Sequence, residues 1–248
     1  MKRRLVLAWT WIKDFVRANP HVWLAMYVPV FLLAFALAEH VITPQSAYWR
    51  SWVPLDDKIP FLEWFIVPYC LWYPFLAGAG LYALVREPAA FRRFMYFLMA
   101  GFSLSLLICF LIPNGQDLRP QSFQRENIFT WIVAGIYRTD TNTNVFPSMH
   151  VVGAIAAAAA VFDCPKLRRL RVPTVVLAVL ISVSTVFVKQ HSVLDIAGGL
   201  ALSLPIGQII YHRQLAAWWQ AWRQKSRERR KRLPALARAK NDPAGHRS

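Results

Sequence analysis

Apolar residues run along this chain in stretches of about 20 that carry few or no charges. A stretch of about that length crosses the hydrocarbon core of a bilayer as a helix. The pattern predicts six transmembrane segments, at residues 20–38, 64–85, 94–112, 145–162, 172–188 and 192–211. The fourth is short unless its helix begins near Ser148. The expected fold class is therefore all-α, a polytopic membrane protein with six transmembrane helices.

Basic residues outnumber acidic ones, with 29 Lys and Arg against 13 Asp and Glu. When the six spans alternate in direction, 23 of these cations fall on the side of both termini and 6 on the other side. In membrane proteins the excess of Lys and Arg typically lies in the cytoplasmic loops, so the N- and C-termini are expected in the cytoplasm. We expect an integral protein of the plasma membrane, the inner membrane in a bacterium. Anionic lipid headgroups explain the basic tail more simply than nucleic acid does.

Three regions are expected along the chain. Residues 1–19 predict an interfacial amphipathic helix, residues 20–211 a six-helix membrane catalytic domain, and residues 212–248 a basic cytoplasmic tail that is disordered from about Leu233. The apolar face of the first helix would carry Leu5, Trp9, Ile12, Phe15 and Val16. A further apolar segment, 128–137, is too short to span, and we expect it to lie flat at the interface as a partial lid.

Small residues fill parts of the fourth and sixth predicted spans. Residues 154–160 are almost all alanine, and Gly198-Gly199 lie in the last span. Small side chains let helix backbones approach closely in lipid, so these two spans are expected to pack together. That packing would bring His150 and His191 to one place. The alternative is that the small residues act only as apolar spacers.

Ionisable residues lie at the ends of the same two spans. Removing their charges from water costs free energy, so their presence there indicates a function. His191 and Asp195 are four residues apart, so on a helix they share one face. The carboxylate of Asp195 would hold one imidazole nitrogen and leave the other directed outward as a base or nucleophile. His150 would stand in the first turn of the fourth span, with Ser148 as its N-cap and as a candidate phosphate-binding residue.

Two cations are predicted on the same non-cytoplasmic face. Arg119 offers a guanidinium suited to phosphate oxygens, and Lys189 lies two residues before His191. Histidines, a carboxylate, cations and a helix N-terminus together indicate phosphoryl transfer, in which protein groups position the phosphoryl group and neutralise its charge. Neither a cofactor nor a metal is required. A His/His/Asp zinc site is the weaker alternative, because neighbouring cations would repel a metal.

The motifs resemble those of the type 2 phosphatidic acid phosphatase superfamily of membrane lipid phosphatases and phosphotransferases. Its common pattern is KxxxxxxRP, then PSGH, then SRxxxxxHxxxD, and the resemblance covers roughly residues 60–211. It implies that His191 is transiently phosphorylated, with Asp195 beside it. It also implies that His150 protonates the leaving group and that Arg119-Pro120 form the RP pair.

Three positions depart from that pattern. Ile112 replaces the first lysine, Met149 replaces the glycine, and Ser184-Thr185 replace the SR pair. With the large Met149 in its PSxH motif and with Lys189-Gln190-His191, the chain is more similar to the branch that includes inositol phosphorylceramide synthase, as it is in the segment 57–61 before the second span. That branch moves a phospho-headgroup between lipids.

The expected function is a membrane lipid phosphatase, acting on a lipid phosphate or diphosphate through a phosphohistidine on the non-cytoplasmic face. The alternative is a phosphotransferase that passes the phospho-headgroup to a lipid alcohol. A proton-coupled transporter is less favoured, because the ionisable groups cluster at one mouth and no inverted repeat occurs. Three aromatic residues of the second span, Tyr69, Trp72 and Tyr73, fit either a lipid groove or an aromatic belt.

Overall fold

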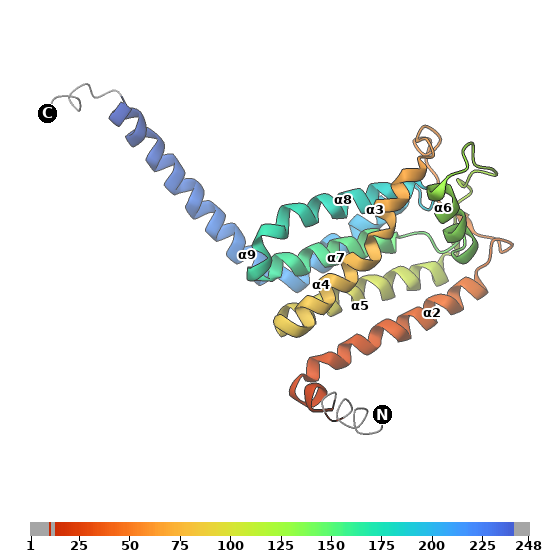
Figure 1. The fold of residues 1–248 in the computed structure, drawn as a ribbon, viewed down its shortest axis with the longest axis horizontal. Helices are drawn as coiled ribbons and strands as arrows, with labels where there is room; N and C mark the ends of the chain where they lie inside the picture. The colour runs from red at the N-terminus through yellow and green to blue at the C-terminus, as the bar shows by residue number, and fades with distance from the viewer. Residues whose placement is uncertain (1–9, 11–12, 241–248) are drawn as a thin grey trace. The chain divides into compact units, whose positions relative to one another are not determined.

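The fold is all-α, as predicted, apart from one pair of two-residue strands. It was obtained as a computed structural model, which describes residue 10 and residues 13–240 (Figure 1). The chain divides into two units, Met1–Ile210 and Tyr211–Ser248. The elements are, in order, η1 (Pro20–Met26), α2 (Tyr27–Val41), β1 (Trp49–Arg50), η2 (Glu63–Phe65), α3 (Ile66–Cys70), α4 (Trp72–Arg86), α5 (Pro88–Leu111), β2 (Asn114–Gly115), α6 (Ile128–Thr139), α7 (Met149–Asp163), η3 (Pro165–Leu170), α8 (Arg171–Phe187) and α9 (Val193–Lys240).

Five helical segments of the described residues are long and apolar enough to cross a membrane. They are Pro20–Val41, Glu63–Arg86, Pro88–Leu111, Pro165–Phe187 and Val193–Gln224. A sixth apolar helix, Met149–Asp163, is shorter. These six follow the order of the six predicted segments, so the expectation of a polytopic helical membrane protein is confirmed.

The short helix α7 is the central one of the first unit, packed against α4, α5 and α8 (Figure 1). Four of its alanines, at positions 154, 156, 157 and 160, are buried. A helix covered by other helices does not have to match the bilayer thickness, because protein and not lipid surrounds it. Residues 145–148 of the predicted span are not helical, and the helix start expected near Ser148 is confirmed. The helix begins at Met149, which places His150 in its first turn.

The second span is broken at Leu71, between α3 and α4. Pro74 explains the break, since it has no N–H to donate to the carbonyl of Cys70 one turn earlier. The break separates Tyr69 from Trp72, and the rings of both contact the His150 imidazole. A local backbone irregularity thus shapes one wall of the site.

The outer connections are tied together by short backbone ladders. Strand β1 pairs in parallel with β2, with Trp49 opposite Asn114, and Thr143 forms a bridge to Gly115. The Asn114 side chain also accepts from the Phe146 backbone N–H at 2.8 Å and donates to the Phe146 carbonyl at 3.1 Å. Three segments far apart in sequence are therefore joined next to the start of α7.

The apolar segment 128–137, which is too short to span, lies within the helix α6. An Asn127–Thr130 capping box begins it, and it packs against η2 and α3. Val133 is buried, whereas the Trp131 side chain is 68% exposed. The position of α6 at a membrane surface stays a prediction.

Near the N-terminus, residues 13–18 are helical, with Phe15 and Val16 half-buried. Leu5, Trp9 and Ile12 of the predicted amphipathic helix lie outside the described residues. In the second unit, α9 continues as helix to Lys240, past the residue where the sequence predicts disorder to begin.

Candidate active site

His191 and Asp195 lie at the turn that joins α8 to α9. The Nδ1 atom of His191 lies 3.2 Å from Oδ2 of Asp195, and the carboxylate is fully buried. The same Oδ2 accepts from the Ser192 backbone N–H at 2.8 Å. An ionised carboxylate only accepts hydrogen bonds, so this contact puts the imidazole proton on Nδ1 and leaves the Nε2 lone pair available. The predicted orienting relationship is present.

His150, from the first turn of α7, faces the available nitrogen. Its Nδ1 lies 3.4 Å from Nε2 of His191, and the two rings meet edge to face. Tyr69 and Trp72 contact the His150 ring, with ring centroids 4.5 Å and 4.8 Å away. Trp72 also donates from Nε1 to the His150 carbonyl at 3.0 Å. His150 is therefore held by aromatic packing, whereas His191 is held by a carboxylate.

Close approach of α7 and α9 brings the histidines together. A Cβ at Gly199 would lie 2.8 Å from Cβ of Val151 and 2.9 Å from the Ser148 carbonyl oxygen, so only glycine fits there. The Ser148 backbone N–H donates to the Asp195 carbonyl at 3.1 Å. The predicted packing of the two spans through small residues is confirmed at this point.

Ser148 stands at the N-cap position of α7, but its side chain makes no capping hydrogen bond. The capping role expected for its hydroxyl is therefore wrong. Its Oγ is buried without a partner among the described residues, as are Nε2 of His150 and Oδ1 of Asn144. Buried polar atoms usually have partners, so the orphan atoms of His150 and Asn144, two residues that line one cavity, suit the polar atoms of a ligand.

Arg119 is near His191 in the fold but is tied to the protein. Its guanidinium donates to the carbonyls of Asp140 at 3.0 Å and Thr141 at 2.6 Å, and to Oε1 of Gln190 at 2.5 Å. It lies over the Tyr137 ring, 4.5 Å from the centroid. Burial lowers the pKa of Arg119, and the nearby carboxylate of Asp140 opposes that effect. Only Nε has no partner in the described structure, so phosphate binding by Arg119 stays a prediction.

Lys189 adopts a left-handed backbone conformation, with φ of 54°. Its ammonium donates to the carbonyls of Asp56 at 2.9 Å and Ile59 at 2.6 Å, in the first outer connection. Burial lowers its pKa, while Asp56 and Asp57 act to raise it. Contact of Lys189 with phosphate stays a prediction, since both of these hydrogen bonds of its ammonium are with this connection.

Two residues of the first outer connection were not among the predicted site residues. Ser51 donates to Oδ1 of Asp195. The buried carboxylate of Asp56 accepts from the Ser192 hydroxyl at 2.6 Å and from the Val193 backbone N–H at 2.8 Å, so it caps α9. The segment 57–61 carried a family signal, but no sequence spacing connects either side chain with a helix more than 130 residues away.

A second polar layer lies beside the histidines. Asp140 accepts from Nε2 of Gln190 at 3.1 Å, and Glu39 accepts from the side chains of Thr141 and Asn144 at 2.5 Å and 2.7 Å. Desolvation raises the pKa of Asp140 to about 6, and the charge of Glu39 adds to that shift. Polar residues in connections usually serve local turns, so the sequence alone does not single out Asp140 or Asn144.

The histidines lie at one end of a cavity of about 290 Å³. Its polar wall comes from the 139–145 segment, and its apolar wall from α2, α4 and α5. The lining residues are Phe31, Leu32, Phe35, Trp72, Tyr73, Phe102, Thr139, Asp140, Thr141, Thr143, Asn144, Val145, Met149, His150, Gln190 and His191. Trp72 and Tyr73, which fit either a lipid groove or an aromatic belt by sequence, line this cavity. No cluster of three His, Cys, Asp or Glu suited to a metal occurs among the described residues.

Comparison with known proteins gives one family match, over residues 99–219. The match is to the PAP2 superfamily. Members of this superfamily are phosphatases or phosphotransferases. The matched region contains His150, His191, Asp195 and Arg119, whereas Ser51 and Asp56 precede it. No curated protein and no solved structure matches the chain.

Proposed function

We propose that this chain is a membrane lipid phosphatase that acts on a lipid phosphate or diphosphate through a phosphohistidine. The observation that carries the proposal is the cavity: its polar end holds two opposed histidines, and its apolar wall is formed by aromatic residues of the spans. A lipid phosphate has the same division between a charged head and an apolar tail. The PAP2 match supports phosphatase or phosphotransferase chemistry.

In the proposed reaction, Nε2 of His191 attacks phosphorus and the bond from phosphorus to the lipid oxygen breaks. Protonated His150 gives its proton to that departing oxygen. Water then attacks the phosphohistidine, His150 accepts its proton, and the phosphorus–nitrogen bond breaks. Asp195 holds His191 in the required tautomer throughout.

The test is phosphate release from a panel of lipid phosphates and diphosphates by the full chain in proteoliposomes. His191→Ala and His150→Ala should each reduce turnover by about 10³-fold or more, and His212→Ala, an exposed histidine, serves as the matched control. Brief incubation with radiolabelled substrate should label the wild type at an acid-labile site and leave His191→Ala unlabelled. Full activity of His191→Ala would end the proposal.

A phosphotransferase is the second candidate, and the polar wall of the cavity favours it. Thr141, Thr143 and Asn144 line the same cavity as the histidines, and Oδ1 of Asn144 has no partner among the described residues, so it is available to accept from an acceptor hydroxyl. Of the positions that depart from the family pattern, Met149 lines the cavity. Thr185 is buried, and its hydroxyl donates to the Ser182 carbonyl at 2.8 Å. Transfer of a labelled headgroup into a new lipid, with little free phosphate, would establish it over hydrolysis.

The proposed orientation has the site on the non-cytoplasmic side, at the plasma membrane. The cation asymmetry of the connections supports it. An alkaline phosphatase fused after Arg125 should then be active in a bacterial host, and a fluorescent protein fused at the C-terminus should fluoresce. The reverse pair of results would invert the topology.

A further inference from the structure

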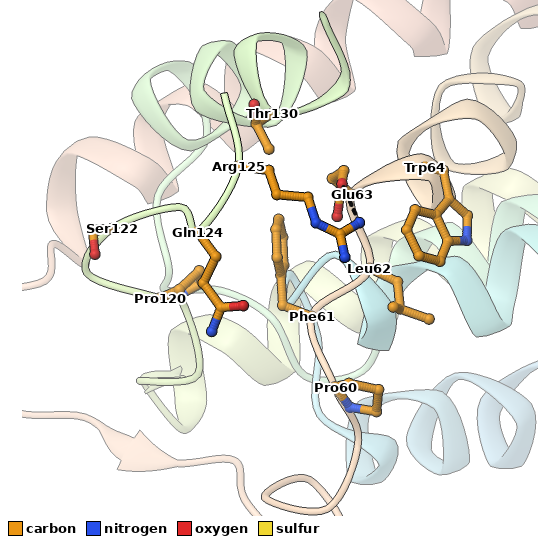
Figure 2. Close-up of a pocket in the computed structure, with 10 residues that line it drawn as sticks. All are labelled: Pro60, Phe61, Leu62, Glu63, Trp64, Pro120, Ser122, Gln124, Arg125 and Thr130. Atoms are coloured by element: carbon orange, nitrogen blue, oxygen red, sulfur yellow. Dashed lines mark ion pairs between the residues drawn. The ribbon is translucent and has the colours of Figure 1, made fainter. Parts of the chain in front are cut away.

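A second cavity, of about 320 Å³, opens between η2, the start of α6 and the connection before it (Figure 2). Its lining residues are Pro60, Phe61, Leu62, Glu63, Trp64, Pro120, Ser122, Gln124, Arg125 and Thr130. None of them lines the histidine cavity. The second cavity therefore needs an explanation of its own.

Packed apolar side chains, both aliphatic and aromatic, separate the two cavities. Phe61 lines the second cavity and packs against a buried cluster formed by Ile66, Tyr69, Val133 and Val188. The Tyr69 ring on the other side of this cluster contacts His150. A molecule in the second cavity is thus kept from the reacting nitrogens by packed side chains, and the cavity is a binding site without turnover.

The charges in this cavity are one buried carboxylate and one exposed guanidinium. Glu63 is only 7% exposed, and its Oε1 lies 3.6 Å from NH1 of Arg125 and 3.2 Å from Nδ2 of Asn127. The Arg125 side chain is 70% exposed. Only the Arg125 end of this pair is exposed, and its atoms are 3.6 Å apart, so Arg125 compensates in part for the desolvation of the buried Glu63 carboxylate. A ligand cation would compensate for it better.

Aromatic rings complete a setting for such a cation. Figure 2 shows the Glu63 carboxylate and the Arg125 guanidinium in the middle of the cavity, with Phe61 on one side in this view and Trp64 on the other. Ring faces attract ammonium groups, and a carboxylate adds a direct ionic hydrogen bond. Arg125, with Gln124 nearby, suits the phosphate of the same molecule.

The surroundings favour a lipid as the source of that molecule. Trp64 begins the span Glu63–Arg86 and is 44% exposed. Ile128 and Trp131 of the neighbouring α6 are 61% and 68% exposed. Exposed tryptophans at the end of a span are typical of the membrane interface, where lipid headgroups lie.

We propose that this second cavity binds the zwitterionic headgroup of an aminophospholipid, with its ammonium on Glu63 between the aromatic rings and its phosphate on Arg125. A purely anionic headgroup would meet the buried carboxylate without a compensating charge. The site goes beyond the proposed phosphatase activity, because the lipid bound here is not consumed.

The test is calorimetric titration of the full chain in detergent with dihexanoyl phosphatidylethanolamine, and with the phosphatidylglycerol of the same chains. The His191→Ala background prevents turnover. Phosphatidylethanolamine should bind about tenfold more tightly or better. Glu63→Gln, which keeps an acceptor for Asn127, should remove that preference, because it weakens the ammonium contact and no longer repels an anionic headgroup.

Two further variants and one control complete the test. Arg125→Gln should weaken both lipids, and Trp64→Leu should weaken phosphatidylethanolamine about fivefold. Arg138→Gln, another exposed arginine of the same region, should change neither. Tighter binding of phosphatidylglycerol, or an unchanged preference in Glu63→Gln, would overturn the site.

The proposed site and the proposed phosphatase function fail separately. Phosphate release by Glu63→Gln and Arg125→Gln in the His191 wild type should equal that of the parent protein. Conversely, loss of the phosphatase hypothesis would leave the binding preference measured in His191→Ala intact.

Discussion

Ser51 donates a hydrogen bond to the carboxylate of Asp195, although 144 residues separate them in the chain. The serine uses Oδ1, while His191 and the Ser192 backbone N–H both use Oδ2. With donors on both oxygens, the carboxylate has a single orientation, and that orientation sets the direction of the His191 imidazole. A residue of the first outer connection thus controls the geometry of the proposed nucleophile.

Asp195→Asn should reduce turnover about 10³-fold, because an amide presents N–H where one of these donors now points and no longer fixes the His191 tautomer. Ser51→Ala should reduce it about tenfold, since it loosens the carboxylate without removing it. Initial rates of phosphate release measure both effects. Thermal unfolding must show that both variants fold, and rates within threefold of the parent for Asp195→Asn would contradict the orienting role.

Asp56→Ala should lower the free energy of unfolding by about 3 kcal/mol, since it leaves buried donors of Ser192 and Val193 without an acceptor. Asp57→Ala is the matched control, because Asp57 is exposed and its side chain accepts from the Trp52 indole at 3.0 Å. That variant should change stability by no more than about 0.5 kcal/mol. Denaturant titrations in one detergent would compare them, and equal effects would remove Asp56 as the cap of α9.

Gly153→Ala should reduce turnover about tenfold and destabilise the fold by about 1–3 kcal/mol. Its new Cβ would lie 2.8 Å from Nε1 of Trp72, the atom that donates to the His150 carbonyl. Gly78→Ala, also in a helix, has no atom within 4 Å of the added Cβ and should be neutral or stabilising. Steady-state rates and melting temperatures of the pair would decide whether Trp72 positions His150.

Asp140 should make stability depend on pH. Its pKa in the folded protein is about 6, above the ordinary 3.8, so the folded state binds the proton more tightly than the unfolded state. The stabilising contribution is full below about pH 4 and is lost as pH rises through about 6. The melting temperature of the wild type should therefore fall relative to Asp140→Asn between pH 4 and 7. A constant difference between the two proteins over that range would contradict the raised pKa.

Sequence patterns predicted the features that depend on local periodicity. The apolar stretches located six helices. The contact predicted between His191 and Asp195 is present, but His191 lies in the turn two residues before α9 begins and not on the helix itself. The small residues at Gly198-Gly199 correctly indicated close packing near Ser148. These signals are local because helix geometry repeats within a few residues.

The remaining parts of the site depend on connections between distant segments. Nothing in the spacing of Asp56 or Ser51 indicates contact with α9, and the ladder between Trp49 and Asn114 is only two residues long. The prediction that the Ser148 hydroxyl caps α7 was wrong, because an N-cap position does not by itself fix the rotamer of the side chain. The Arg119 guanidinium donates to backbone carbonyls and to Gln190. The Arg-Pro dipeptide alone does not predict these hydrogen bonds.

The short ladder between β1 and β2 limits how far the proposed catalytic site can be transferred to another protein. The region matched to the PAP2 superfamily begins at residue 99, yet the ladder binds that region to a connection that precedes it. A segment of residues 99–219 transplanted into another scaffold would carry both histidines and their aspartate. It would leave behind Ser51, Asp56 and Trp72. The segment from Trp49 to Trp72 thus belongs with the proposed site, and redesign of this protein has to keep it.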